Sequence, residues 1–83
     1  MTNGEKLVGL QFNPSGLTEV DEVKQTFAKM IDKLEDKFAN SVQHGTATAN
    51  REFLFNYAKQ ELIRAQMAMV KYLNKNSLFA ALS

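Results

Sequence analysis

The longest uninterrupted segment of the chain runs from Ala49 to Lys75, and it restricts the possible folds more than any other feature. It contains neither Gly nor Pro, so no residue in it is expected to break a helix. One set of apolar residues recurs at spacings of three and four: Leu54, Ala58, Leu62, Ala65, Met69 and Leu73. These spacings place the set on one face of a helix with 3.6 residues per turn. The segment therefore predicts a long helix with an apolar stripe.

A second apolar flank lies beside this stripe on the same predicted helix. It consists of Phe53, Tyr57, Ile63, Met67 and Val70. Because a single partner helix would leave this flank in water, we expect both a partner within the chain and contacts from other subunits. A chain of 83 residues buries little apolar surface by itself, so self-association would add to its stability.

The first half of the chain predicts another amphipathic helix, from Thr18 to Ala39. Asn13, Pro14, Ser15 and Gly16 form a turn before it, and Thr18 with Asp21 resembles a weak capping box. At 1.5 Å per residue this helix would be about 33 Å long. Its apolar residues fall on one face: Val20, Val23, Phe27, Met30, Ile31, Leu34 and Phe38.

These segments predict an all-α fold, an antiparallel two-helix hairpin with a short N-terminal arm, in one domain over residues 1–83. The predicted boundaries are an arm at 1–17, a helix at about 18–39, a loop at about 40–49, a helix at about 50–75 and a tail at 76–83. Residues 1–6 are polar and are expected to be frayed, whereas the apolar tail is expected to dock. The cap of the second helix is left open between Thr46, Thr48 and Asn50.

Charge and composition exclude several classes of function. Ten Lys and Arg residues against nine Asp and Glu give a net charge of +1, too weak to hold duplex DNA non-specifically. An anionic ligand must therefore be small and locally bound. The chain has no Cys, no secretory signal pattern and no apolar run of membrane-spanning length, which favours a cytosolic protein.

Candidate catalytic residues are few. His44 is the only histidine and is interpreted as a solvated loop residue, and without Cys the usual nucleophile and base pairs are missing. The carboxylate pairs are interpreted as solvated partners of nearby lysines: Glu19 with Glu22 and Glu35 with Asp36. No phosphate-binding loop and no metal-ligand spacing occurs in the sequence. We therefore expect a protein that is not an enzyme, with no cofactor and no metal.

A resemblance to a known family adds to this interpretation. The segments from Val8 to Gly16 and from Val20 to Lys24, with Ile31-Asp32, resemble the N-terminal half of small phage anti-CBASS sponge proteins. Arg51-Glu52 and the segment from Ala65 to Lys71 are similar to the arginine-led final helix of the same hairpin, which anti-Thoeris sponges share. The order and spacing of these motifs over about residues 8–73 carry the resemblance. The chain has Ala68 where many relatives have Trp, and Phe12 where several have Tyr.

The resemblance implies a function and an assembly. Sponges of this family sequester cyclic oligonucleotide immune signals, such as cGAMP, in the cytoplasm of the infected bacterium without cleaving them. The resemblance implies a hexamer, a trimer of dimers, which binds cyclic dinucleotides between subunits and, in many members, cyclic trinucleotides at separate sites.

The resemblance also assigns site residues. Phe12, Asn13 and Lys24 match the cyclic dinucleotide site, in which Phe12 would stack on a base. Thr26 and Arg64 match the cyclic trinucleotide site, in which the arginine would clamp phosphate. Arg51 is a weaker candidate. Each has a structural alternative. Phe12 would be a hydrophobic staple, Asn13 a turn residue and Arg51 a helix-start arginine. Arg64 would be a surface arginine paired with Gln60 or Glu61, and Lys24 and Thr26 would be ordinary exposed helix residues.

Two other functions stay open. One is a helical-hairpin adaptor that binds another protein through its second apolar flank and takes no small ligand. The other is a nucleic-acid binder, which the net charge disfavours.

Overall fold

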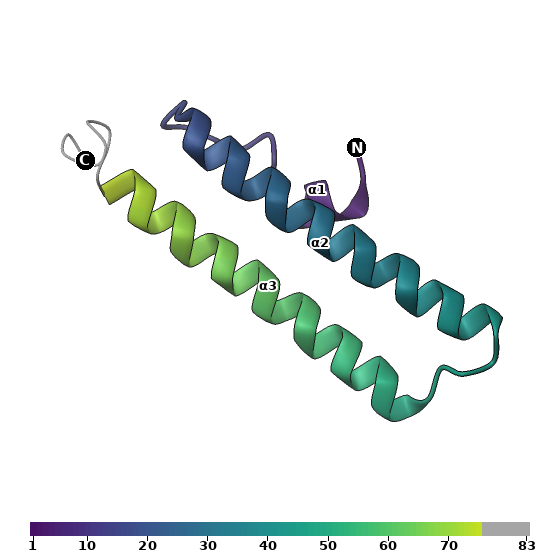
Figure 1. Cartoon of the computed structure of the whole chain (residues 1–83). Helices are drawn as coiled ribbons and strands as arrows, with labels where there is room; N and C mark the ends of the chain where they lie inside the picture. Colours follow the sequence, from purple (N-terminus) through teal and green to yellow (C-terminus); the bar gives the residue numbers. More distant parts are fainter. Residues whose placement is uncertain (76–83) are drawn as a thin grey trace.

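The computed structural model describes residues 1–75, which form three helices and no strand (Figure 1). They are α1 at Asn3–Leu7, α2 at Thr18–Gln43 and α3 at Ala49–Lys75. The prediction of an all-α fold is confirmed for this part of the chain. The predicted docking of the tail at 76–83 lies outside the described residues.

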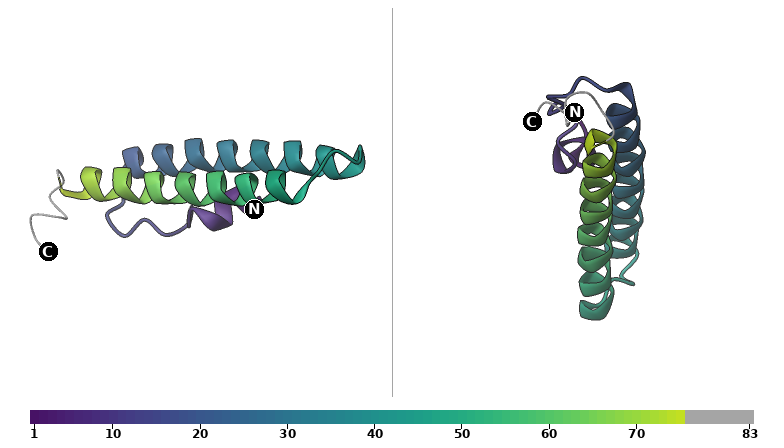
Figure 2. Two further views of the ribbon diagram at one scale, coloured as in Figure 1. Left: turned by 90° about the horizontal axis from the view of Figure 1, so that it is seen from below. Right: turned by 90° about the vertical axis from the view of Figure 1, so that its left-hand side faces the viewer.

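The two long helices lie side by side and run in opposite directions (Figures 1 and 2). α2 begins at Thr18, as predicted, but ends at Gln43 rather than at Ala39. The predicted end was wrong because polar residues do not stop a helix. The stop comes at Gly45, whose φ of 71° lies in the left-handed region that favours glycine.

The starts of the long helices are held by side chains of the preceding loops. Thr48 caps α3, because its hydroxyl accepts a hydrogen bond of 3.1 Å from the backbone N–H of Arg51. The predicted capping box at Thr18 was wrong, since Leu17 occupies the capping position and makes no side-chain cap. Asn13 holds this end instead, and its amide donates to the carbonyl of Leu17 at 2.8 Å and to Oδ1 of Asp21 at 3.0 Å.

The arm, residues 1–17, is ordered from its first turn. The prediction that residues 1–6 are frayed was wrong, because Thr2 and Glu5 form a complete capping box at the start of α1. Gly4 then packs against α2, and its N–H donates to Oδ1 of Asp32 at 2.8 Å. A Cβ at Gly4 would lie 2.2 Å from the carbonyl oxygen of Ala28, so only glycine permits this approach.

The core lies where the arm meets both long helices. Its buried residues are Val8, Phe27, Ala28 and Ile31, and the partly buried residues packed against them are Leu10, Val23, Leu62 and Ile63. The arm therefore lies along one side of the hairpin, and within residues 1–75 no segment covers the other side (Figure 2).

This placement of the arm changes which face of α3 is buried. Of the predicted stripe, Leu54, Ala65 and Met69 are exposed, and the buried residue of α3 is Gln66. The predicted position of the buried face was therefore wrong. The arm packs over one side of the contact between α2 and α3, so the residues of α3 that face the arm, Ile63 and Gln66, are the more buried ones. None of the helices within residues 1–75 has the length and apolar character needed to cross a membrane.

Candidate functional site

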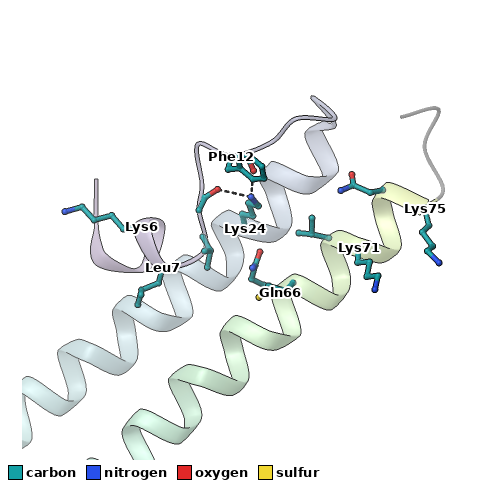
Figure 3. Close-up of a pocket in the computed structure, with 12 residues that line it drawn as sticks. Lys6, Leu7, Phe12, Lys24, Gln66, Lys71 and Lys75 are labelled. Carbon is teal, nitrogen blue, oxygen red and sulfur yellow. Dashed lines mark hydrogen bonds between the residues drawn. The ribbon is translucent and has the colours of Figure 1, made fainter. Parts of the chain in front are cut away.

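A groove of about 660 Å³ lies between the arm and the C-terminal half of α3, and we call it the arm groove (Figure 3). Its volume lies within the roughly 300 to 1,000 Å³ of typical small-molecule sites. Lys24 of α2 lies at its inner side, between the arm and α3. The lining residues are Lys6, Leu7, Val8, Gly9, Phe12, Lys24, Gln66, Met67, Val70, Lys71, Asn74 and Lys75.

Phe12 presents an aromatic ring at the mouth of this groove. Its side chain is unusually open for a phenylalanine, with an exposed fraction of 73%. A tight turn holds it there, in which the N–H of Phe12 donates to the carbonyl of Gly9 at 2.9 Å and Gly9 has a φ of 65°. An exposed, positioned ring is suited to stacking on a nucleobase. Because Phe12 is exposed, the structure does not support its alternative role as a hydrophobic staple.

Lys24 fixes the part of the arm that carries Phe12. It is buried, and its Nζ donates to the carbonyl of Gly9 at 2.8 Å and to the carbonyl of Phe12. The pKa of this amine is lowered, because the effect of burial outweighs the opposite effect of the nearby charge of Asp21. An ammonium group has three N–H donors, so one donor is left beyond these two bonds. Lys24 is therefore first a positioning residue for Phe12, and its contact with a ligand stays a prediction.

Three further lysines line the groove, and in Figure 3 Lys6 extends away from α3 while Lys71 and Lys75 extend away from the arm. Lys6 comes from α1, and Lys71 and Lys75 lie one turn apart on α3. None of them pairs with a carboxylate of residues 1–75, and no Asp or Glu of this part of the chain lines the groove. Like charges one turn apart repel each other, so a bound anion would relieve this repulsion. The sequence interpretation missed these three lysines, although the spacing of Lys71 and Lys75 was visible in it.

The other residues matched to the cyclic dinucleotide and trinucleotide sites have local partners. Asn13 is used in the turn before α2, where it also accepts a hydrogen bond of 3.0 Å from the hydroxyl of Ser15. Thr26 is exposed on α2, and its hydroxyl donates to the carbonyl of Glu22 at 2.9 Å. Neither lines the arm groove.

Both arginines also lie outside the arm groove. Arg64 is exposed on α3, and its guanidinium is 3.9 Å from the carboxylate of Glu61. Arg51 lines a separate hollow of about 290 Å³ near the loop end of the hairpin, beside Phe38 and Phe55. Thr26 and Arg64 line none of the main hollows among residues 1–75, so their predicted site stays a prediction.

A second, apolar groove of about 760 Å³ runs between α2 and α3 on the side of the hairpin without the arm. We call this the open-side groove. Lys33, Lys37 and Glu61 are its charged residues. Its lining residues are Met30, Lys33, Leu34, Lys37, Tyr57, Ala58, Glu61, Leu62 and Ala65.

The arm groove offers stacking, apolar contact and positive charge. No group of three or more potential metal ligands is found within residues 1–75. His44 lies at the loop between α2 and α3, and its Nδ1 is 2.7 Å from the carbonyl oxygen of Asn40. The groove thus brings together an exposed aromatic ring, apolar side chains and lysines.

No family model, no curated protein and no solved structure matches this chain.

Proposed function

We propose that this protein binds a cyclic oligonucleotide signal in the arm groove and holds it without breaking a bond. In this proposal it acts as a phage sponge in the cytoplasm of the infected bacterium and keeps immune signals from their effectors, as the resemblance to anti-CBASS sponges implies. The observation that carries the proposal is the exposed ring of Phe12 beside three lysines that lack a carboxylate partner among residues 1–75.

The charge of the arm groove supports a ligand with phosphates. A cyclic dinucleotide has two phosphodiester groups, and each carries one negative charge at neutral pH. Lys6, Lys71 and Lys75 would approach these groups from two sides, because one lysine lies on α1 and two lie on α3. Exposed charge pairs of this kind are screened by salt, so binding should weaken as the ionic strength rises.

The affinity that a sponge requires supports an assembly. A nanomolar dissociation constant corresponds to about 12 kcal/mol. One stacked ring contributes roughly 1 to 3 kcal/mol, and exposed lysines contribute little each, so one open groove gives too little. We therefore include the hexamer, a trimer of dimers, in the proposal, with a second chain closing the groove over the ligand.

The open-side groove supplies a surface for this assembly. It is apolar, and its rim carries Lys33 and Lys37 on α2 and Glu61 on α3. If two copies meet there about a twofold axis, the carboxylate of one chain can face the lysines of the other. In the same proposal, Thr26 and Arg64 lie at a second ligand site between chains, which takes cyclic trinucleotides.

The test is calorimetry with a cyclic dinucleotide and a cyclic trinucleotide on the wild type and on single variants, with the oligomer followed by native mass spectrometry. Phe12→Ala should weaken dinucleotide binding by roughly 1 to 3 kcal/mol and leave trinucleotide binding nearly unchanged. Arg64→Ala should weaken trinucleotide binding and make it less sensitive to salt. Phe53→Ala is the control, provided that native mass spectrometry shows the oligomer unchanged, because Phe53 is 65% exposed, against 73% for Phe12, and lies outside the arm groove.

The binding data distinguish two separate sites from one shared pocket, and the state of the recovered nucleotide distinguishes binding from cleavage. Bound nucleotide should be recovered intact after the protein is heated. Equal losses for both ligands in either variant would indicate one shared pocket, and degraded nucleotide would contradict a binding function. A wild type that binds neither ligand would refute the proposal.

A second candidate function is a protein adaptor, and the open-side groove is the observation that favours it. An adaptor would use Tyr57 and Met30 to bind another protein and would need no nucleotide. Absence of nucleotide binding in the wild type, together with loss of partner binding in Tyr57→Lys, would support this function.

A further inference from the structure

Gln66 is a buried polar residue in the wall of the arm groove. Its exposed fraction is 4%, and it is the buried residue of α3. Its side-chain oxygen, Oε1, has no hydrogen-bond partner within residues 1–75. Figure 3 shows this side chain extending from α3 toward Lys24 and the arm, at the inner side of the groove.

Stability does not explain a glutamine at this position. A buried amide oxygen without a partner lowers the free energy of unfolding, because it has lost its hydrogen bonds to water. The neighbouring residues Leu62, Ile63 and Val70 are apolar, so an apolar side chain of the same length would pack among them without this penalty. Buried polar groups without partners are rare in native proteins, so this one calls for a specific explanation.

We propose that Gln66 reads the base that stacks on Phe12 and that it selects adenine. The proposal rests on the binding function proposed above. A glutamine amide pairs with adenine through two hydrogen bonds: its Oε1 accepts from the N6 amino group of the base, and its NH₂ group donates to N7. The final torsion of a glutamine side chain is broad, so a rotation about this bond turns Oε1 toward the groove.

The same geometry rejects the other bases. Guanine presents two acceptors, O6 and N7, on this edge, so Oε1 would again lack a donor. Hypoxanthine differs from adenine by an oxygen in place of the N6 amino group and gives the same mismatch. A pyrimidine has no N7 to accept from the amide.

The experiment compares cyclic di-AMP with cyclic di-IMP, whose bases differ at the reading edge, on the wild type and on Gln66→Met. The wild type should bind cyclic di-AMP about 5- to 150-fold more tightly than cyclic di-IMP, the range expected for one bidentate contact. In Gln66→Met this ratio should fall to about one. Because methionine has a similar length and no unpartnered polar atom, the thermal midpoint of Gln66→Met should equal or exceed that of the wild type.

Gln60→Met is the matched control, since Gln60 is exposed on α3 and does not line the arm groove. It should keep the wild-type ratio. The inference is overturned if Gln66→Met keeps the ratio, or if it unfolds at a lower temperature and loses affinity equally for both ligands, as a packing role would require. A wild type that binds cyclic nucleotides without this base preference overturns the inference alone. A wild type that binds none of them overturns the proposed function as well.

Discussion

Gly4→Ala tests whether the arm makes the groove, because Gly4 is the point of closest approach between α1 and α2. The new Cβ would lie 2.2 Å from the carbonyl oxygen of Ala28 and 2.7 Å from Oδ1 of Asp32. The carbonyl belongs to the backbone of α2 and cannot move aside. To restore an ordinary contact of 3.4 Å, α1 would have to move away by the difference between 3.4 and 2.2 Å, about 1.2 Å.

The expected loss follows from these contacts. Overpacking at a tight site costs about 1 to 3 kcal/mol, and loss of the bond between the Gly4 N–H and the Asp32 carboxylate costs about 1.5 to 3 kcal/mol. Alanine recovers about 1 kcal/mol through its better helix propensity. The free energy of unfolding should therefore fall by about 1.5 to 5 kcal/mol. If this exceeds the stabilisation from docking of the arm, the arm detaches while α2 and α3 stay paired.

The assay is chemical denaturation, together with hydrogen exchange of the backbone amides of α1. In Gly4→Ala the amide of Val8, which donates to the carbonyl of Gly4, should lose protection, and binding that depends on Phe12 should weaken. Gly45→Ala is the matched control. It makes the same exchange in the loop, where φ is 71° and no atom lies within 4 Å, so it should cost about 1 to 2 kcal/mol through backbone strain alone.

Comparison of the two variants shows whether the docking of the arm depends on Gly4. Gly45→Ala should keep the protection of α1 and the binding of ligand. If Gly4→Ala unfolds within a few tenths of a kcal/mol of the wild type and keeps its α1 amides protected, the docking of the arm does not depend on this contact.

Two further predictions concern the groove and the start of the arm. Lys24→Met removes two hydrogen bonds to the arm and should lower the free energy of unfolding by about 1 to 3 kcal/mol. It should also broaden the NMR signals of the Phe12 ring. Lys29→Met, at an exposed lysine of α2, should have neither effect. A hydrogen bond from the backbone N–H of Thr2 lowers the pKa of Glu5. The ionised carboxylate therefore stabilises α1 fully at a pH above the ordinary pKa of glutamate, and this stabilisation is lost as the pH falls through the lowered pKa of Glu5. The amide shifts of Thr2 should follow this acid transition, and Glu5→Gln should abolish it; a transition that persists in Glu5→Gln would contradict the assignment.

The sequence predicted the long helices because α2 has a strong apolar periodicity and the segment of α3 contains neither Gly nor Pro. It gave the start of α2 at Thr18 and the extent of α3 from Ala49 to Lys75. The end of α2 was missed, because Ser41 and Val42 lack the pattern of the preceding turns and yet continue the helix to Gly45. Hydropathy marks which residues are buried, whereas a helix ends where the backbone finds another hydrogen-bond arrangement.

The arm was the harder part to predict. Its order depends on contacts between residues far apart in the sequence, such as Gly4 with Asp32 and Lys24 with Gly9. No local pattern reveals such contacts, although Thr2 with Glu5 was a readable capping box. Phe12 was predicted from a resemblance, and its high exposure is a separate observation that fits a stacking role. Gln66 was missed, since a glutamine between apolar residues of a helix gives no sign of being buried.

The exposure of Phe12 also links ligand binding to assembly. A base that stacks on this ring covers one face of the ring, and the other face of the base then meets either water or another part of the protein. The described part of one chain places Lys24 and Gln66 at the inner side of the groove, with Lys24 Nζ 5.6 Å from the centroid of the Phe12 ring, and leaves 73% of Phe12 exposed. In the proposed function, a second chain would cover the base, and the open-side groove is the apolar surface through which chains would meet. If two chains complete the site, as proposed, the apparent affinity for a cyclic dinucleotide should rise with protein concentration through the range in which the chains associate.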